Sequence, residues 1–160
     1  MAEWSSLFTD IVGSTEKAVA LGDAAWAQLL ERHHAAVRAE IARFGGDEMD
    51  TSGDGFFAIF REPVSAIAAG LGIVDAVHSV GLRVRVGVHV GDCRLADGKC
   101  TGLAIHIGAR LVALAAPGEV LVSEAARIGV GPGYRFSDRG VHELKGVPGT
   151  WRLFAAERSA

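Results

Sequence analysis

Residues 48–60, EMDTSGDGFFAIF, decide the fold, because two short strand-like runs flank the turn residues Gly53-Asp54-Gly55 and so predict a β-hairpin. Before this hairpin, residues 5–12 predict a strand that ends at the polar turn Gly13-Ser14-Thr15. Ser14 or Thr15 can cap the long helix expected next, in which apolar residues recur at helical spacing until Gly45-Gly46 ends it. A strand, a helix and a hairpin therefore follow one another at the start of the chain.

The remaining residues predict two further helices and several strands. One helix begins at Pro63 and runs to about Val80. Residues 83–90 alternate as in a strand with one apolar face, and residues 91–98 predict a further strand and turn. The next expected elements are a helix over 102–115, a strand over 119–122, a short helix capped by Ser123 and a strand-rich tail. The order βαββαβ with C-terminal additions predicts one α+β domain over residues 1–160, a ferredoxin-like sandwich.

Composition restricts the class of protein. A chain of 160 residues can bury roughly 70% of the surface that its unfolded form exposes, and the formal charge of −3 argues against nucleic-acid binding. No segment approaches the roughly 18 uninterrupted apolar residues that would span a membrane, and the N-terminus lacks the pattern of a signal peptide. Cys93 and Cys100 have neither CxxC spacing nor a disulfide framework, so we expect plain thiols in a cytoplasmic protein.

Two aspartates indicate metal chemistry. Asp10 lies near the end of the first predicted strand and Asp54 at the hairpin tip, and these elements are neighbours in a βαββ unit, so the carboxylates can converge. A carboxylate pair with phosphate oxygens and waters is the usual magnesium site. The turn at residues 13–15 leads into a helix N-terminus, which binds anions such as phosphate. Either aspartate alone would be an ordinary turn residue, but the pair indicates a site for a metal and a phosphate.

Several long segments resemble the catalytic domain of class III nucleotide cyclases, in the order of that family. Two of them surround the aspartates, FTDIVGST (residues 8–15) and SGDGFFAIF (52–60). The others are RVGVHVG (85–91), GLAIHIGARL (102–111), PGEVLVS (117–123) and Leu144-Lys145-Gly146. The resemblance covers about residues 5–156, and several matches in order are far more specific than one glycine motif.

The resemblance implies conversion of a nucleoside triphosphate, most favourably ATP, into a 3′,5′-cyclic monophosphate and pyrophosphate. It also implies a head-to-tail homodimer, in which each interface site takes metal ligands from one chain and base-reading and transition-state residues from the other. The implied ligands of two Mg²⁺ or Mn²⁺ ions are Asp10, Ile11 and Asp54. The implied phosphate contacts are Gly13, Ser14, Thr15 and Lys145. Arg110 matches the family's transition-state arginine.

Three positions depart from the adenylate cyclase pattern. Asp50 stands where such enzymes usually carry the lysine that reads adenine, and Lys99 stands at the position of the partnering aspartate. The two residues either preserve this pair with exchanged charges or leave the base untouched, or Asp50 accepts from guanine, as a glutamate does in guanylate cyclases. His106 replaces an asparagine that orients the ribose or the transition state, and it is either a catalytic donor or a histidine packed at the dimer interface.

Other functions stay open at this point. A catalytically degenerate cyclase homologue would bind nucleotide or dimerise without turnover, and the three departures favour it. A diguanylate cyclase is suggested by Gly45-Gly46-Asp47-Glu48, the start of that family's signature, although Met49 replaces the phenylalanine expected next. Cyclase domains usually adjoin sensor domains, so the domain can also be part of a longer protein.

Overall fold

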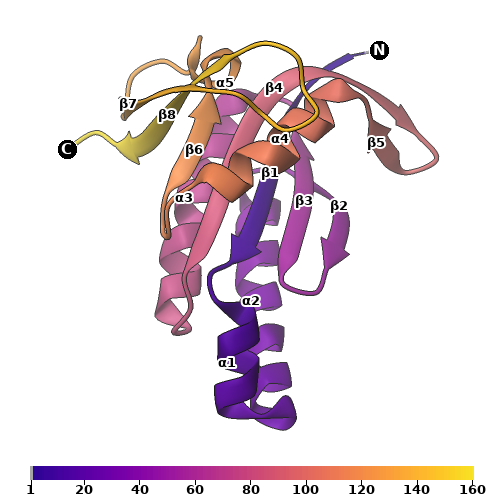
Figure 1. Ribbon diagram of the computed structural model, residues 1–160, viewed down its shortest axis with the longest axis vertical. Helices are drawn as coiled ribbons and strands as arrows, with labels where there is room; N and C mark the ends of the chain where they lie inside the picture. The colour runs from indigo at the N-terminus through magenta and orange to yellow at the C-terminus, as the bar shows by residue number, and fades with distance from the viewer. Residues whose placement is uncertain (1) are drawn as a thin grey trace.

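The computed structural model describes residues 2–160 and is shown in Figure 1. The first half contains β1 (Ala2–Ile11), α1 (Ser14–Leu21), α2 (Asp23–Arg43), β2 (Asp47–Ser52), β3 (Gly55–Phe60) and α3 (Pro63–Ser79). The second half contains β4 (Val84–Ala96), β5 (Lys99–Thr101), α4 (Leu103–Leu114), β6 (Val120–Ser123), α5 (Glu124–Arg127), β7 (Tyr134–His142) and β8 (Trp151–Arg158). The hairpin predicted over residues 48–60 is present as β2 and β3.

The strands form a sheet in the order β2-β3-β1-β4-β6-β8-β7, and β5 pairs with the far end of β4. β1 lies between β3 and β4 and is antiparallel to both, whereas β4 and β6 are parallel. Asp10, near the end of β1, is opposite Gly55 on one side and Arg85 on the other. The predicted α+β class is confirmed, and its topology places the end of β1 beside the hairpin turn.

Helices cover both faces of the sheet, with α2 and α3 on one face and α4 on the other (Figure 1). On the α3 side, Val86 lies in the main core and faces Gly70. On the α4 side, two glycines allow a close approach between helix and strands. A Cβ atom on Gly87 would lie 2.8 Å from the backbone nitrogen of Val112, and one on Gly108 would lie 2.8 Å from Cε1 of Phe8. The position of α4 is therefore fixed by direct contact with the sheet.

The long helix predicted after the first strand is two helices. Gly22 has φ 82° and ψ 165°, a conformation that favours glycine, and it separates α1 from α2. The N-cap of α1 is Gly13, with no side-chain capping hydrogen bond, so the prediction of a Ser14 or Thr15 cap is wrong. α1 buries none of its residues, whereas α2 buries His33, Val37 and Ile41 against the core. Among residues 2–160, none of the helices combines the length and apolar character needed to span a bilayer.

Cys93 and Cys100 form a disulfide, so the prediction of plain thiols is wrong. The strand predicted over 83–90 continues as β4 to Ala96, and the chain then turns at Asp97 and Gly98, both with positive φ. This turn folds β5 back onto β4 and brings the two cysteine Cα atoms to 5.9 Å, a normal separation for a disulfide. The pairing depends on this tight turn, which the cysteine spacing alone does not reveal.

His89 makes the fold sensitive to acid. Its ring is buried on β4, its Nδ1 lies 2.7 Å from Oγ of Ser123, and burial lowers its pKa to about 4. In the unfolded chain the pKa of this histidine is near 6.5, so the unfolded state binds a proton more readily than the folded state does. The free energy of unfolding therefore falls as the pH drops from about 6.5 to 4. The expected contribution is about 1.4 kcal/mol per pH unit within that window.

Replacement of this histidine by a neutral amide tests the acid sensitivity. We expect His89→Gln to have a shallower dependence of the free energy of unfolding on pH than the wild type between pH 6.5 and 4, measured by urea denaturation. The variant can be less stable at pH 7.5 without affecting this comparison, because the slope is the observable. Equal slopes for the two proteins would contradict the assignment to His89.

Candidate active site

Asp10 and Asp54 form a carboxylate pair at the end of β1. Asp54 lies in the turn between β2 and β3, and the pairing of Asp10 with Gly55 brings the two side chains together. The pKa of Asp10 is raised by partial burial, by the negative charge of Asp54 and by hydrogen bonding to it; the positive charge of Arg85 and the backbone N–H of Ile11 act in the opposite direction. Bringing the two carboxyl groups together is therefore unfavourable without a cation.

This donor set fits a divalent cation. Hard cations such as Mg²⁺ and Mn²⁺ prefer carboxylate and carbonyl oxygens. Ile11 is 2% exposed and packs in the main core, and its side chain is apolar, so the backbone oxygen is the one donor atom that it could offer. Within residues 2–160 no cluster of three acidic, histidine or cysteine side chains could hold a metal. Substrate oxygens and water would therefore complete the coordination.

The turn after β1 places a helix N-terminus beside the carboxylates. Gly13 adopts φ 64° and starts α1, whose first backbone N–H groups lack partners within the helix. Ser14 donates a hydrogen bond of 2.7 Å from Oγ to Oδ2 of Asp54, so its hydroxyl is engaged by the carboxylate. A cavity of about 390 Å³ opens here; its lining residues are Ser14, Thr15, Ala18, Trp26, Leu30, Gly53 and Asp54. The structure thus brings the predicted phosphate contacts 13–15 next to Asp54.

Two neighbouring histidines of α2 were missed in the sequence, and one of them, His34, supports this turn. His34 Nε2 lies 2.8 Å from the carbonyl oxygen of Gly53, and its ring meets Phe56 edge-on at 5.2 Å. A carbonyl oxygen only accepts hydrogen bonds, so Nε2 of His34 carries the proton. The neighbouring His33 is fully buried, and burial together with the charge of His34 lowers its pKa to about 4. The available signal was that His33 falls on the apolar stripe of the helix.

His34 should affect metal affinity because it holds the backbone next to Asp54. We expect His34→Ala to raise the Mn²⁺ concentration needed for half-saturation by roughly three- to tenfold, the size of one lost hydrogen bond. His34→Gln should remain close to wild type, because its amide can donate to the same carbonyl. Arg38→Ala is the matched control, because Arg38 also links α2 to the hairpin, through a 2.8 Å ion pair with Glu48, but not at the turn. Equal Mn²⁺ affinity in His34→Ala and the wild type would refute this role.

Arg110 and His106 lie on α4, away from the cavity beside Asp54. Both side chains are exposed, and their spacing of four residues places them on one face of the helix. Lys145 is exposed in the segment between β7 and β8, next to the buried Leu144. None of the three lines the cavity that contains Asp54. A single copy of the chain therefore supplies the carboxylates and the helix N-terminus together, and presents these cationic and imidazole groups elsewhere on its surface.

Asp50 and Lys99 line one cavity of about 420 Å³. The other lining residues are Met49, Phe57, Cys100, Thr101 and Ile105. Asp50 and Met49 come from β2 and Lys99 from β5, so the pocket is lined by residues of both strands. The structure thus places Asp50 and Lys99 in the same pocket.

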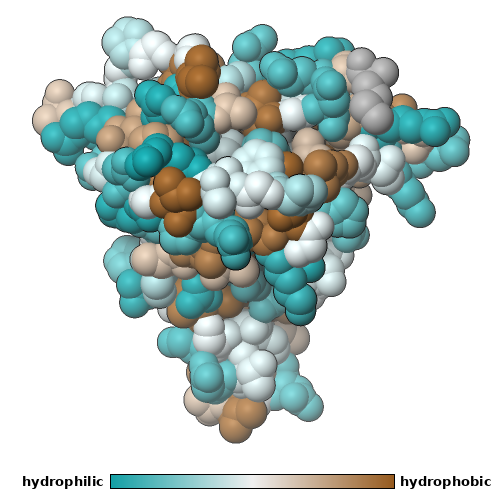
Figure 2. Space-filling model, turned by 45° about the horizontal axis from the view of Figure 1, so that its top comes forward, coloured by the Kyte–Doolittle hydropathy of each residue, from teal (hydrophilic) through white to brown (hydrophobic). Residues whose placement is uncertain are grey.

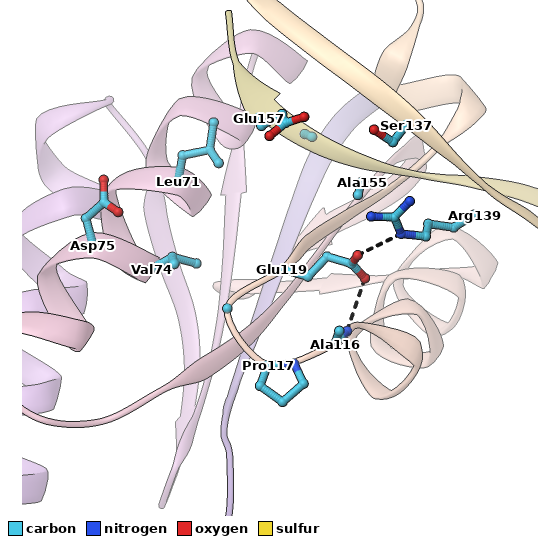
Figure 3. Close-up of a pocket in the computed structure, with 12 residues that line it drawn as sticks. Leu71, Val74, Asp75, Ala116, Pro117, Glu119, Ser137, Arg139, Ala155 and Glu157 are labelled. Atoms are coloured by element: carbon cyan, nitrogen blue, oxygen red, sulfur yellow. Dashed lines mark hydrogen bonds and ion pairs between the residues drawn. The ribbon is translucent and has the colours of Figure 1, made fainter. Parts of the chain in front are cut away.

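A further cavity, of about 380 Å³, contains none of the predicted site residues. It lies between α3 and the β6–β8–β7 edge of the sheet (Figure 3). Glu119 spans its floor: one carboxylate oxygen accepts from the Ala116 backbone at 3.1 Å, and the other pairs with Arg139 at 3.0 Å. Both oxygens of Glu119 therefore have partners within the chain, as is typical of a structural ion pair.

Comparison with known proteins gives the family. The model of the adenylate and guanylate cyclase catalytic domain matches residues 2–156. The chain is 33% identical to a protein of Rhizobium meliloti (strain 1021), over 95% of this chain and 17% of that protein. It is 29% identical to the pH-sensitive adenylate cyclase MT1302 of Mycobacterium tuberculosis (strain CDC 1551 / Oshkosh), over 96% of this chain and 40% of that protein.

Solved structures agree with this result. The adenylyl cyclase CyaB from P. aeruginosa has the same fold, with a TM-score of 0.85 at 19% identity over 99% of this chain and 95% of that chain. The adenylate/guanylate cyclase/hydrolase from Silicibacter pomeroyi has a TM-score of 0.82 at 26% identity, over 99% and 98% of the two chains. The chain therefore belongs to the adenylate and guanylate cyclase catalytic domain family. It spans less than half the length of the two sequence relatives named above.

Proposed function

We propose that this domain converts a nucleoside triphosphate, preferably ATP, into the 3′,5′-cyclic nucleotide and pyrophosphate, as a homodimer with two Mg²⁺ or Mn²⁺ ions at each site. The observation that carries the proposal is the Asp10–Asp54 pair beside the N-terminus of α1. Two carboxylates alone would repel a triphosphate, whereas with divalent cations they form a site for it. The helix N-terminus adds N–H donors for phosphate oxygens.

The chain's residues divide the work of the proposed reaction. The 3′-hydroxyl loses its proton to water, and the ribose 3′-oxygen bonds to the α-phosphorus. The bond from that phosphorus to the pyrophosphate oxygen breaks, and pyrophosphate leaves with the electron pair. Bound divalent ions would lower the pKa of this hydroxyl and neutralise the triphosphate. Asp10, Asp54 and the Ile11 backbone would hold the ions, while Gly13, Ser14, Thr15 and Lys145 would contact phosphates. Arg110 and His106 of the other copy stabilise charge at the α-phosphate and orient the ribose.

The surface of α4 supports the homodimer. His106 and Arg110 share this helix with Leu103 and Leu114, which are 53% and 44% exposed. Figure 2 shows hydrophobic side chains reaching the surface among polar ones over the middle of the molecule. Exposed leucines suit a helix that meets a second copy when, as here, the neighbouring functional groups have no ion pair within residues 2–160. The separation of Arg110 from the Asp54 cavity within one chain favours a site completed by two chains.

Product formation tests the proposed function. Purified protein should make cyclic AMP from ATP with Mn²⁺, and the product should be the intramolecular cyclic monophosphate. Absence of a cyclic nucleotide from both ATP and GTP, with triphosphate binding retained in calorimetry, would favour the degenerate homologue. A cyclic dinucleotide formed from two GTP molecules, with release of two pyrophosphates, would indicate a diguanylate cyclase. Against that activity, Gly45-Gly46-Asp47-Glu48 covers the turn after α2 and the first two residues of β2, not the hairpin tip.

The base preference depends on Asp50 and Lys99. We propose that their shared cavity receives the purine, because one acceptor and one donor side chain face it. If the exchanged pair reads adenine, the double variant Asp50→Lys with Lys99→Asp should keep the ratio of kcat/KM for ATP over GTP within a few-fold, while Asp50→Lys alone should lower kcat/KM for ATP by about tenfold or more. A wild type that prefers GTP, with that preference lost in Asp50→Lys, would instead identify a guanylate cyclase.

The compartment of the domain and its place in a longer protein can be proposed from the proposed substrate and from the length of the relatives. We propose a cytoplasmic domain, where nucleoside triphosphates are abundant, attached to a sensor domain in a longer protein. The length of the two sequence relatives, of which this chain spans 17% and 40%, supports the second part.

A further inference from the structure

The β4–β5 hairpin has little non-covalent support. Among residues 94–101, Cys100 alone is buried, and the others are exposed. Three residue pairs join the strands, Arg94 with Thr101, Leu95 with Cys100 and Ala96 with Lys99. The hairpin projects from the side of the sheet (Figure 1). Isolated two-stranded hairpins are marginally stable in water, so something else must hold Lys99 in place.

The Cys93–Cys100 disulfide supplies this anchor. Cys93 is 1% exposed in the part of β4 that pairs with β1, and Cys100 is 6% exposed in β5. Both sulfurs belong to a small apolar cluster; its other members are Trp4, Met49, Ile59, Phe57 and Ile105. The cross-link therefore ties β5 to β4, and the two cysteines pack the base of the hairpin against apolar residues of β1, β2 and β3.

The anchored strand is one wall of the cavity that contains Asp50. Lys99, Cys100 and Thr101 of β5 line it, opposite residues of β2 and β3. The central sheet holds the wall formed by β2 and β3. The disulfide holds the other wall, β5, against β4. The cross-link thus has a direct geometric effect on the position of the only lysine in that cavity.

We propose that the Cys93–Cys100 disulfide positions Lys99 and Thr101 opposite Asp50, and so sets the affinity and selectivity of this pocket for a purine base. The proposal rests on the proposed function in one respect, namely that a purine occupies this cavity. The disulfide is a positioning element, since it acts through the side chains that meet the base. Its loss widens and loosens the pocket while the carboxylate pair, on other elements, is unchanged.

The effect is reversible by a dithiol. Two thiols of the reductant supply two electrons and two protons, the Cys93–Cys100 S–S bond breaks, and two cysteine thiols and one reductant disulfide are formed. In the reducing cytoplasm proposed above the open form is favoured, and the cross-linked form is favoured under oxidising conditions. Purine recognition would then depend on the redox state around the protein.

Nucleotide binding under two redox conditions tests the proposal without requiring turnover. The ligands are non-hydrolysable analogues of ATP and GTP with Mg²⁺, titrated by calorimetry into the oxidised protein, the dithiothreitol-treated protein and the Cys93→Ala/Cys100→Ala variant. We expect reduction to weaken the affinity for the preferred analogue by roughly three- to tenfold, the size of one or two lost polar contacts. The ratio of the affinities for the ATP and GTP analogues should move closer to one. The variant should match the reduced wild type and should not respond to dithiothreitol.

Hydrogen exchange provides a second readout. Reduction should speed amide exchange in residues 94–101 and leave β6, residues 120–123, unchanged. Equal affinities and selectivities in all three samples would overturn the proposal even if exchange changes, as would a response of the variant to dithiothreitol or a lack of analogue binding in every sample. A protein that forms no cyclic nucleotide but shows the expected redox-dependent binding would contradict the proposed function and leave the positioning role supported.

Discussion

Asp54→Ala is expected to reduce cyclic nucleotide formation by about a thousandfold or more, because it removes one of the two carboxylates that hold the divalent cations. The folded state should be little affected. Asp54 lies in the turn between β2 and β3, and its removal relieves the repulsion from Asp10 while it leaves the Ser14 hydroxyl without one partner. Circular dichroism and the melting temperature should therefore stay close to those of the wild type.

Direct metal binding separates the loss of a ligand from a loss of fold. Mn²⁺ titration followed by electron paramagnetic resonance should show weaker binding in Asp54→Ala. The matched control is Asp75→Asn, which removes an exposed aspartate from α3 that pairs with Arg158 at 2.9 Å, a contact of small value for stability. This control should retain activity and Mn²⁺ binding. Full activity in Asp54→Ala would show that the metal assignment is wrong.

Arg110→Ala is expected to lower kcat by roughly a hundred- to a thousandfold while the KM for ATP and the affinity for Mn²⁺ change little. This pattern is typical of a group that acts on charge formed in the transition state. The exposed position of Arg110 on α4 makes a large loss of stability unexpected. Arg43→Ala, at the exposed end of α2, is a suitable control for the removal of one helical arginine. A change confined to KM would contradict the transition-state role.

Mixing two inactive variants tests whether the site is shared between chains. In a heterodimer of Asp54→Ala and Arg110→Ala, one composite site has both defects and the other has none. Random assortment of equal amounts makes half of the dimers mixed, so activity should recover to about a quarter of the wild type. No recovery after subunit exchange, confirmed by a tag on each variant, would show that the carboxylates and the arginine act within one chain or that no such dimer forms.

The sequence predicted the central part of the fold because its signals are local. The glycines around Asp54 mark a tight turn between two strand-like runs, and the alternation over residues 83–90 marks a strand with one buried face. The proximity of Asp10 and Asp54 was predicted because the first strand and the hairpin are neighbours in a βαββ unit. The pKa of Asp10, which the charge of Asp54 raises, agrees with this prediction. The class III cyclase resemblance is confirmed by the family match.

Other features depend on contacts that sequence patterns do not contain. The helix break at Gly22 depends on one backbone conformation, and the disulfide depends on a turn at residues 97–98. His34 acts through a hydrogen bond to a backbone carbonyl nineteen residues away, which leaves no motif. The roles of Arg110, His106 and Lys145 stay predictions, because the proposed site needs a second chain.

The close packing of α4 limits how this domain can vary. Gly87 and Gly108 bring the helix against the strands, and any side chain at either position would meet an atom within 3 Å. Arg110 is two residues from Gly108 on the same helix, so the separation of the two backbones sets how far its guanidinium reaches. Residues that never touch a nucleotide would then be constrained as strictly as those that do, and substrate preference can change more freely in the projecting hairpin than beneath this helix.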